Sequence, residues 1–210
     1  MDKPNFKKAK EEAYKTLMLQ ENFSFPINPK KIKLKEYDIK IVSFQEYMKK
    51  TKITLEQLTS NGNFNDGFTY IKENNILIFY NEDIESEERK TWTISHELGH
   101  IVLNHTNQSE KNEAEANFFA SQLLVPQCVL KHLVKNGTNI TPLYLSEKFK
   151  ISKEASENCI HTLEKVIENE YIMTDYDDII IQLFKPFVSL DYSLDSYLDE
   201  LDNRRKDFYF

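Results

Sequence analysis

The sequence predicts an α+β fold in which a small sheet comes first, two amphipathic helices follow, and a helical annex comes after them. Segments 37–44, 68–71 and 76–80 have the length and composition of short strands. Ser86 and Ser109 each precede a segment with apolar residues at helical spacing. A serine in that position favours a helix start, because its hydroxyl accepts a hydrogen bond from the first turn.

Length and composition limit the class of protein. A chain of 210 residues accommodates one domain with a helical annex, but not two large domains. With 27 Lys and Arg against 34 Asp and Glu, the net charge of −7 disfavours non-specific binding to a phosphate backbone. The apolar runs are too short to span a membrane, no secretory signal is recognisable, and two cysteines cannot staple a fold of this size. We therefore expect a cytoplasmic protein without a membrane segment.

The elements of the first part follow from its periodicity and its turns. Residues 5–20 predict a helix, and Pro26, Asn28 and Pro29 after it prevent its continuation. Segment 37–44 predicts a strand, and 45–58 predicts a short polar helix. Segments 68–71 and 76–80 flank two asparagines and predict a β-hairpin, because asparagine tolerates the positive φ of a tight turn.

Helices dominate the rest of the predicted fold. After the two helices that begin at the serine caps, we expect further helices around 127–135, 142–150 and 153–168. We therefore expect three parts in the chain. Residues 1–130 form the first domain, residues 131–170 form a helical annex, and residues 171–210 form an acidic, tyrosine-rich C-terminal extension.

The motif of greatest chemical interest is the H-E-x-x-H sequence at residues 96–100. Residues four apart on a helix lie on one face, so His96 and His100 can direct two imidazoles at one zinc ion. Glu97 is offset by one position, so it can act as a general base without being a ligand. The motif predicts a zinc site of catalytic type.

A third ligand is expected on the following helix. His105 lies about 140° around an extended helix from His100, which predicts a surface residue and not a ligand. Glu113 shares its helix face with alanines that permit close approach, and we favour it over Glu115, whose face is bulkier. A solvated carboxylate remains the alternative for Glu113. Asn117, one turn later, can hydrogen-bond a ligating histidine and fix its tautomer.

These two helices carry a family resemblance. Residues 89–100 read RKTWTISHELGH, and residues 113–126 read EAEANFFASQLLVP. Both blocks resemble the ImmA/IrrE family of metallopeptidases, in which similar blocks surround the zinc site. The chain departs from the family pattern at Thr91 and Trp92, where Arg and Phe are usual. The resemblance is specific over about residues 68–126 and weak after 165.

The resemblance implies a zincin-like fold and a ligand set. It implies zinc, one ion per chain, on His96, His100 and Glu113, with Glu97 as the base. The family's E-x-x-x-[DN] spacing supports Glu113 over Glu115. Members of the family commonly cleave a helix-turn-helix repressor of a phage, mobile element or stress response, which implies a protein substrate of that kind.

A substrate-binding strand is also expected. In zincin-like folds an edge strand just ahead of the active-site helix pairs with the extended substrate. We expect the segment just before the active-site helix to pair with the substrate in this way. The alternative is that its inward-facing residues belong to a buried core strand. The segment consists of Ile76, Leu77, Ile78, Phe79 and Tyr80.

The annex and the extension have weaker signals. Residues 143–163 resemble a helix-turn-helix, but the start of the second helix carries one Lys against two Glu, so direct DNA binding is disfavoured and packing or partner docking is preferred. The extension predicts a peripheral strand and helix with a solvated acidic face. A surface that recognises a basic partner or shields the site is the alternative.

The predicted function is hydrolysis of a peptide bond by a zinc metalloendopeptidase. The alternative is a zinc-containing binding module that docks a repressor or toxin partner without cleaving it. Because a purely structural zinc site needs no general base, Glu97 favours the peptidase. Ligand type alone leaves Mn²⁺ and Co²⁺ open as alternatives to zinc, and the sequence does not define the oligomeric state.

Overall fold

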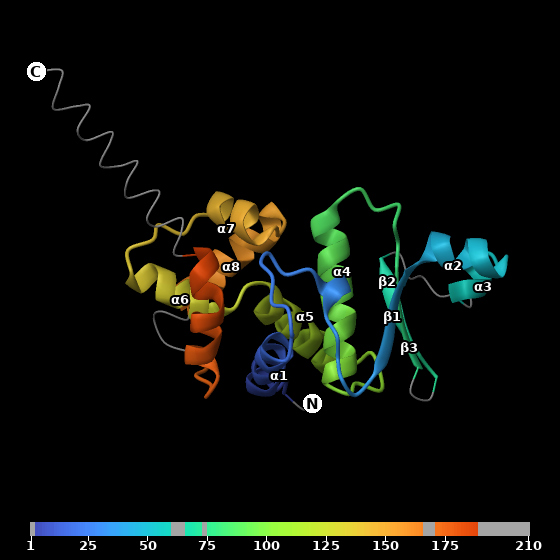
Figure 1. The fold of residues 1–210 in the computed structure, drawn as a ribbon, viewed down its shortest axis with the longest axis horizontal. Coiled ribbons are helices and arrows are strands. Elements are labelled where there is room, and N and C mark those ends of the chain that lie inside the picture. The colour runs from blue at the N-terminus through green and yellow to red at the C-terminus, as the bar shows by residue number, and fades with distance from the viewer. Residues whose placement is uncertain (1–2, 60–65, 73–74, 166–170, 189–210) are drawn as a thin grey trace, which may run out of the picture.

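The architecture is a small sheet covered by successive layers of helices. The structure is a computed structural model that describes residues 3–59, 66–72, 75–165 and 171–188. Within these ranges, α4 (Glu87–Val102) lies against the sheet, and α5 (Glu110–Leu124) with α1 (Phe6–Met18) forms the next layer. The helical annex lies beyond them (Figure 1). The observed fold is α+β, as predicted.

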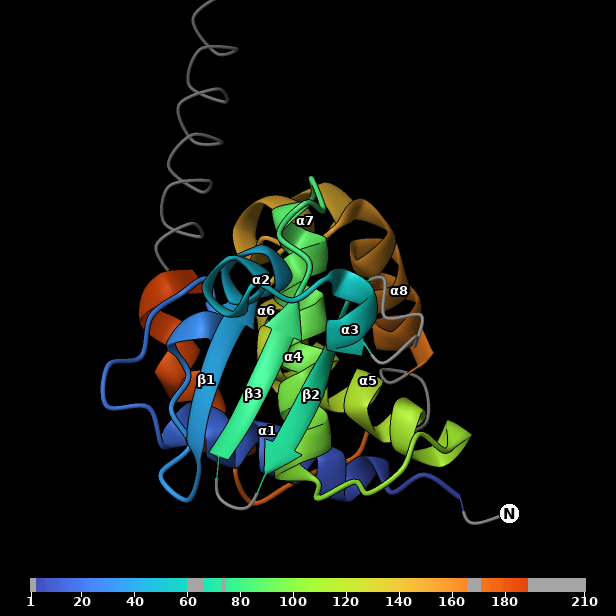
Figure 2. The same ribbon diagram turned by 90° about the vertical axis from the view of Figure 1, so that its right-hand side faces the viewer.

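The described strands form a mixed sheet in the order β1-β3-β2. β1 (Asp38–Ser43) runs parallel to β3 (Asn75–Tyr80), and β2 (Gly67–Lys72) runs antiparallel to it. β2 and β3 are the two strands of the predicted hairpin. Figure 2 shows β3 between its two neighbours, with α4 behind the sheet.

The central position of β3 corrects one prediction. The expected edge strand pairs on both sides, so its backbone groups are already hydrogen-bonded and it cannot accept a substrate by strand addition. Most of its side chains are buried, as in the alternative interpretation. The residues wrongly assigned to the substrate strand are Ile76, Leu77, Ile78, Phe79 and Tyr80. In the described part of the chain, β2 is the edge strand nearest to α5.

The two central helices begin where the sequence predicts. The hydroxyl of Ser86 accepts from the backbone N–H of Arg89, and that of Ser109 accepts from Asn112. The helices pack closely because small residues meet between them. A methyl group added to Gly99 would lie 3.2 Å from the Cα of Ala116.

The N-terminal helix and the segment after it pack against α5 and α4. α1 packs against α5 and buries Tyr14, whose hydroxyl lies 3.3 Å from Gln122 Oε1. The short helix η1 (Pro29–Lys31) follows and contacts α4. The predicted helix at 45–58 is split into two, because Lys52 adopts a left-handed conformation. The two pieces are α2 (Phe44–Thr51) and α3 (Leu55–Thr59).

The annex consists of α6 (Gln127–Lys135), α7 (Pro142–Phe149) and α8 (Lys153–Lys165), all at predicted positions. The C-terminal extension, in which we expected a peripheral strand and a helix, has a helix at 177–188. This helix packs into the core through residues that include Phe184. The rest of the extension, residues 189–210, lies outside the described residues, as does 166–170. No helix in the described ranges is long and apolar enough to cross a bilayer.

A buried lysine joins the first helix to the last. Lys10 is fully buried; its Nζ donates to the carbonyl oxygen of Ile172 at 2.6 Å and lies 3.6 Å from Asp177 Oδ1. Burial lowers the pKa of Lys10, and the neighbouring Asp177 partly offsets this effect. Residues 171–188 are therefore anchored to α1.

Candidate metal centre

Three potential ligands meet where the middle of α4 faces the start of α5. His96 Nε2 lies 3.0 Å from His100 Nε2, and the two nitrogens lie 3.3 and 3.4 Å from the carboxylate oxygens of Glu113. Ligands placed 2.0–2.1 Å from a tetrahedral ion are about 3.3 Å apart, so the triad has the size of three corners of a zinc site. The donor set, two imidazoles and one carboxylate, also suits zinc.

Asn117 is placed to fix the orientation of one ligand. Its Oδ1 lies 2.9 Å from Nδ1 of His96. With the amide oxygen as acceptor, the proton of the ring is on Nδ1, and the lone pair of Nε2 is directed into the triad. This is the interaction expected from the sequence, one helical turn after Glu113.

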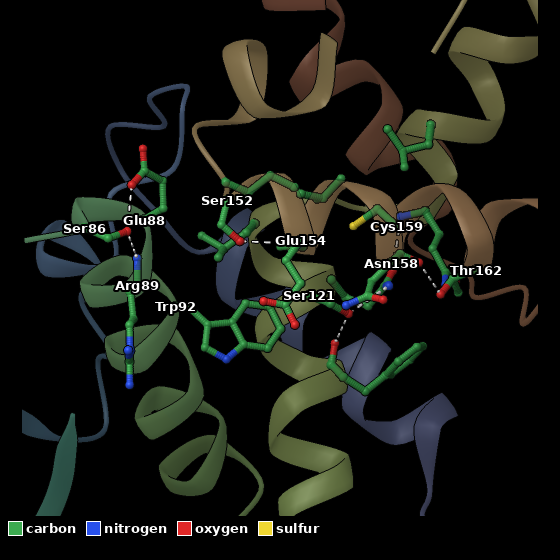
Figure 3. A pocket seen from close by; sticks show the side chains of 18 of the residues that line it. Ser86, Glu88, Arg89, Trp92, Ser121, Ser152, Glu154, Asn158, Cys159 and Thr162 are labelled. Carbon is green, nitrogen blue, oxygen red and sulfur yellow. Dashed lines mark hydrogen bonds between the residues drawn. The ribbon is translucent and has the colours of Figure 1, made fainter. Parts of the chain in front are cut away.

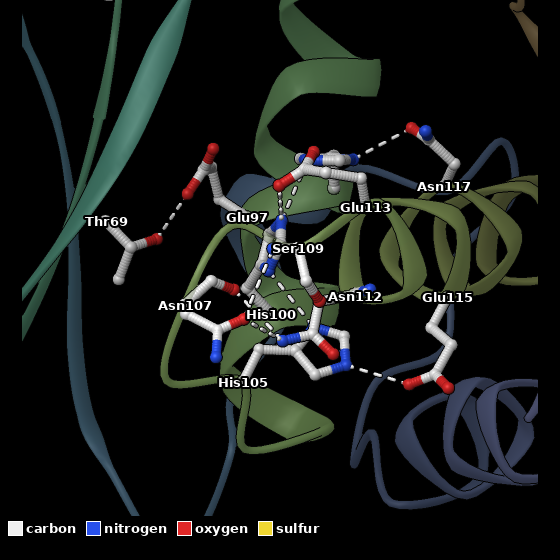
Figure 4. Close-up of polar contacts among 11 residues, drawn as sticks. Thr69, Glu97, His100, His105, Asn107, Ser109, Asn112, Glu113, Glu115 and Asn117 are labelled. Atoms are coloured by element: carbon white, nitrogen blue, oxygen red, sulfur yellow. Dashed lines mark hydrogen bonds and ion pairs between the residues drawn. The ribbon is translucent and has the colours of Figure 1, made fainter. Parts of the chain in front are cut away.

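Glu97 lies beside the triad and faces β2 (Figure 4). Thr69 of β2 donates a hydrogen bond from Oγ1 to Glu97 Oε2 at 2.6 Å. Burial raises the pKa of Glu97, although the hydrogen bond from Thr69 and the proximity of His96 act in the opposite direction. A carboxylate with a raised pKa is suited to accepting and returning a proton near neutral pH. No sequence pattern identifies Thr69, because its role depends on how the sheet packs on α4.

Comparison with known protein families agrees with this geometry. Residues 35–161, more than half of the chain, match the family model of the Peptidase M78 group, described as the IrrE N-terminal-like domain. The chain belongs to this family. The match includes the sheet, both central helices and most of the annex. No curated protein matches the chain in sequence.

This member of the IrrE-like peptidase family has a second polar layer that the sequence patterns do not predict. His105 Nδ1 lies 3.1 Å from Nδ1 of His100, and His105 Nε2 lies 3.0 Å from Glu115 Oε2. Glu115 Oε1 in turn accepts the backbone N–H of Asn5 at 2.7 Å. The side chain of His105 is only 6% exposed, so the prediction of a surface residue is wrong. Figure 4 shows this layer on the opposite side of His100 from Glu97.

The turn after α4 explains why His105 returns to His100. Asn104 has a φ of 58°, and its backbone N–H donates to Ile101 while that of His105 donates to His100. This is a Schellman ending, in which an asparagine in the left-handed conformation reverses the chain. The angle expected on a continuous helix no longer applies after Leu103, the C-cap residue.

The surroundings of His100 favour its metal-binding form. Burial, with His96 and His105 close by, lowers the pKa of His100 to about 4. The imidazole is therefore neutral at pH 7, and neutral imidazole is the form that binds metals. The pKa of Glu115 is lowered, because its hydrogen bonds to Asn5 and His105 outweigh the effect of burial.

Proposed function

We propose that this protein is a zinc-dependent endopeptidase with His96, His100 and Glu113 as ligands and Glu97 as general base. The observation that supports the proposal most strongly is the spacing of the triad, which is that of a tetrahedral zinc site with one corner left for a reactant. The family match adds that the chain is a member of a peptidase family, and a peptidase implies a protein substrate.

The proposed chemistry is hydrolysis of a peptide bond. Zinc at the triad would supply Lewis acidity, which polarises a carbonyl and makes a water molecule more acidic. The Glu97 carboxylate accepts a proton from the attacking water and returns it to the amine that leaves. Thr69 holds one oxygen of Glu97, so the carboxylate keeps its orientation during this exchange.

The substrate backbone is expected to lie along the outer edge of β2. This strand carries Thr69 next to the base, and its outer side has no strand partner among the described residues. Tyr70 and Ile71 are 50% and 56% exposed, so the strand offers apolar contacts to an extended peptide. Strand addition provides affinity through main-chain hydrogen bonds, without requiring a particular sequence.

The target we propose is a regulatory protein such as a helix-turn-helix repressor, in accordance with the resemblance of the two helical blocks. We place the activity in the cytoplasm. Cys128 and Cys159 are both free thiols, which agrees with a reducing compartment.

Substitution of the base tests this proposal directly. We expect Glu97→Gln to retain about one zinc per chain and to lower turnover by about 10²–10⁴-fold, because only the proton acceptor is removed. The assay is mass-spectrometric detection of cleavage in a peptide library from a bacterial proteome, with zinc measured on the same samples. Glu110→Gln, an exposed carboxylate at the start of α5, is the matched control. Zinc-loaded wild type that cleaves nothing would instead support the non-proteolytic binding module.

A further inference from the structure

The shared face of α4 and α5 continues beyond the metal ligands. The helices run antiparallel, and Gly99 meets Ala116 between them. Residues four apart lie on one face of a helix. Because the helices are antiparallel, the residue four positions earlier on α4 faces the residue four positions later on α5. Two facing pairs along this register are His100 with Glu113 and His96 with Asn117. The same register predicts that the next pairs are Trp92 with Ser121 and Glu88 with Val125.

The two pairs beyond the ligands line a cavity. It has a volume of about 590 Å³ and lies between α4, α5 and α8 (Figure 3). We call it the α8 pocket. Trp92 and Ser121 lie on its wall, one turn from His96 and Asn117. The volume is within the range of clefts that bind ligands, and the pocket lies on the same face as the metal centre.

The pocket has an excess of negative charge. Its lining includes three carboxylates and one cation, Arg89, and that guanidinium is already held by Asp66 through two bonds of 2.7 and 2.8 Å. The other two carboxylates belong to Glu88 and Glu154. Neither has a cationic side chain within ion-pair distance among the described residues, and Glu88 only accepts a hydrogen bond from Ser86. Both carboxylates are therefore available to a cationic ligand.

The remaining lining suits a long side chain with a charged end. Apolar side chains, including Phe118, Leu124 and Ile151, line the pocket. Glu154 and Trp92 both line the pocket (Figure 3), so it offers a carboxylate and an aromatic ring, and each of these groups attracts cations. Burial raises the pKa of the Cys159 thiol to about 11, so this residue lines the pocket as a neutral group.

We propose that the α8 pocket binds a lysine or arginine side chain of the peptide substrate. The proposal rests on the peptidase function given above. The aliphatic stem packs on Trp92, and the cationic end meets Glu154. One helical turn from His96 to Trp92 advances about 6 Å, which an extended peptide covers with about two residues. The basic residue therefore lies about two positions from the bond that is cleaved.

The single tryptophan of the chain makes binding measurable without turnover. Trp92 is the only tryptophan in the sequence, so its fluorescence monitors the pocket. The probes are a short blocked alanine peptide with one central arginine and the same peptide with neutral citrulline. We expect the arginine peptide to change the fluorescence of the zinc-loaded Glu97→Gln protein saturably, and the citrulline peptide to bind about tenfold more weakly.

Matched variants locate the recognised charge. In the same background, Glu154→Gln is expected to weaken binding of the arginine peptide about fivefold. Glu157→Gln should leave binding unchanged, because Glu157 lies on α8 outside the pocket lining and pairs with Lys153. Equal affinity for the two peptides, equal effects of the two variants, or no fluorescence change with either peptide would overturn the proposal.

The two proposals fail in different ways. If wild type cleaves the peptide library with no preference for a basic residue near the cleaved bond, the pocket proposal is wrong and the peptidase function stands. If Trp92 distinguishes arginine from citrulline but no peptide is cleaved, the pocket binds a basic side chain as inferred and the peptidase function is wrong.

Discussion

The two sides of the candidate metal centre differ in solvent exposure and in the roles of their residues. On the open side, the side chain of Glu113 is 40% exposed, next to Glu97. On the closed side, the side chains of His105 and Glu115 are 6% and 7% exposed. Glu113 and Glu115 are only two positions apart on α5. Helix geometry therefore directs one carboxylate to the proposed metal site and the other to His105, which contacts the proposed ligand His100.

The largest expected effect is loss of the metal when the open side is changed. Glu113→Ala removes one of the three proposed ligands, and we expect its zinc content to fall from about one per chain to background after dialysis. Glu115→Ala keeps all three proposed ligands and should retain zinc. Elemental mass spectrometry on both variants gives the answer. A loss of zinc from both, or from Glu115→Ala alone, would mean that the two sides are not distinct.

A smaller effect on metal affinity should come from the closed side. His105→Ala removes the hydrogen-bond partner of His100 Nδ1, and we expect zinc affinity to weaken by about 10–100-fold with the stoichiometry unchanged. Competition with a chromophoric chelator measures the dissociation constant. His132→Ala on α6, a histidine that contacts Asn136 and not the centre, is the control. An unchanged affinity in His105→Ala would show that the buried layer does not orient the ligand.

The smallest expected effect is on folding stability. Here a change on the closed side should cost more than a change on the open side. In the zinc-free protein, Glu115→Ala leaves the buried His105 and the N–H of Asn5 without their acceptor, so we expect a loss of about 1–3 kcal/mol in the free energy of unfolding. Glu113→Ala alters a partly exposed group and should change it by less than about 0.5 kcal/mol. Urea denaturation measures both. Similar losses would contradict the assignment of Glu115 to the closed side.

Local patterns predicted the parts of the centre that lie on regular helices. The spacing of His96 and His100, the alanine-rich face of Glu113 and the position of Asn117 all depend on helical periodicity, which is visible in the sequence. The caps at Ser86 and Ser109 fix where these helices begin, so the register between them is also constrained. These expectations agree with where the structure places the residues.

The features that the sequence did not predict depend on how a helix ends or on pairing between strands that are far apart in the sequence. The left-handed Asn104 returns His105 to the centre, and a helical projection cannot anticipate this reversal. Similarly, β3 is an edge strand if only its hairpin partner is considered. β1, from residues more than thirty positions earlier, covers its other side and makes β2 the edge. Parallel pairing of this kind leaves no local signal.

The hydrogen bonds around the triad have a consequence for how this protein can diverge. All the side chains that hold or orient the proposed metal come from residues 96–117, a single helical hairpin. The surfaces proposed to select the substrate lie outside these residues. They are on β2, on the parts of α4 and α5 that carry Trp92 and Ser121, and on α8. Changes at those positions can therefore alter which peptide is recognised while residues 96–117 keep their chemistry, so that selectivity and reactivity can diverge independently.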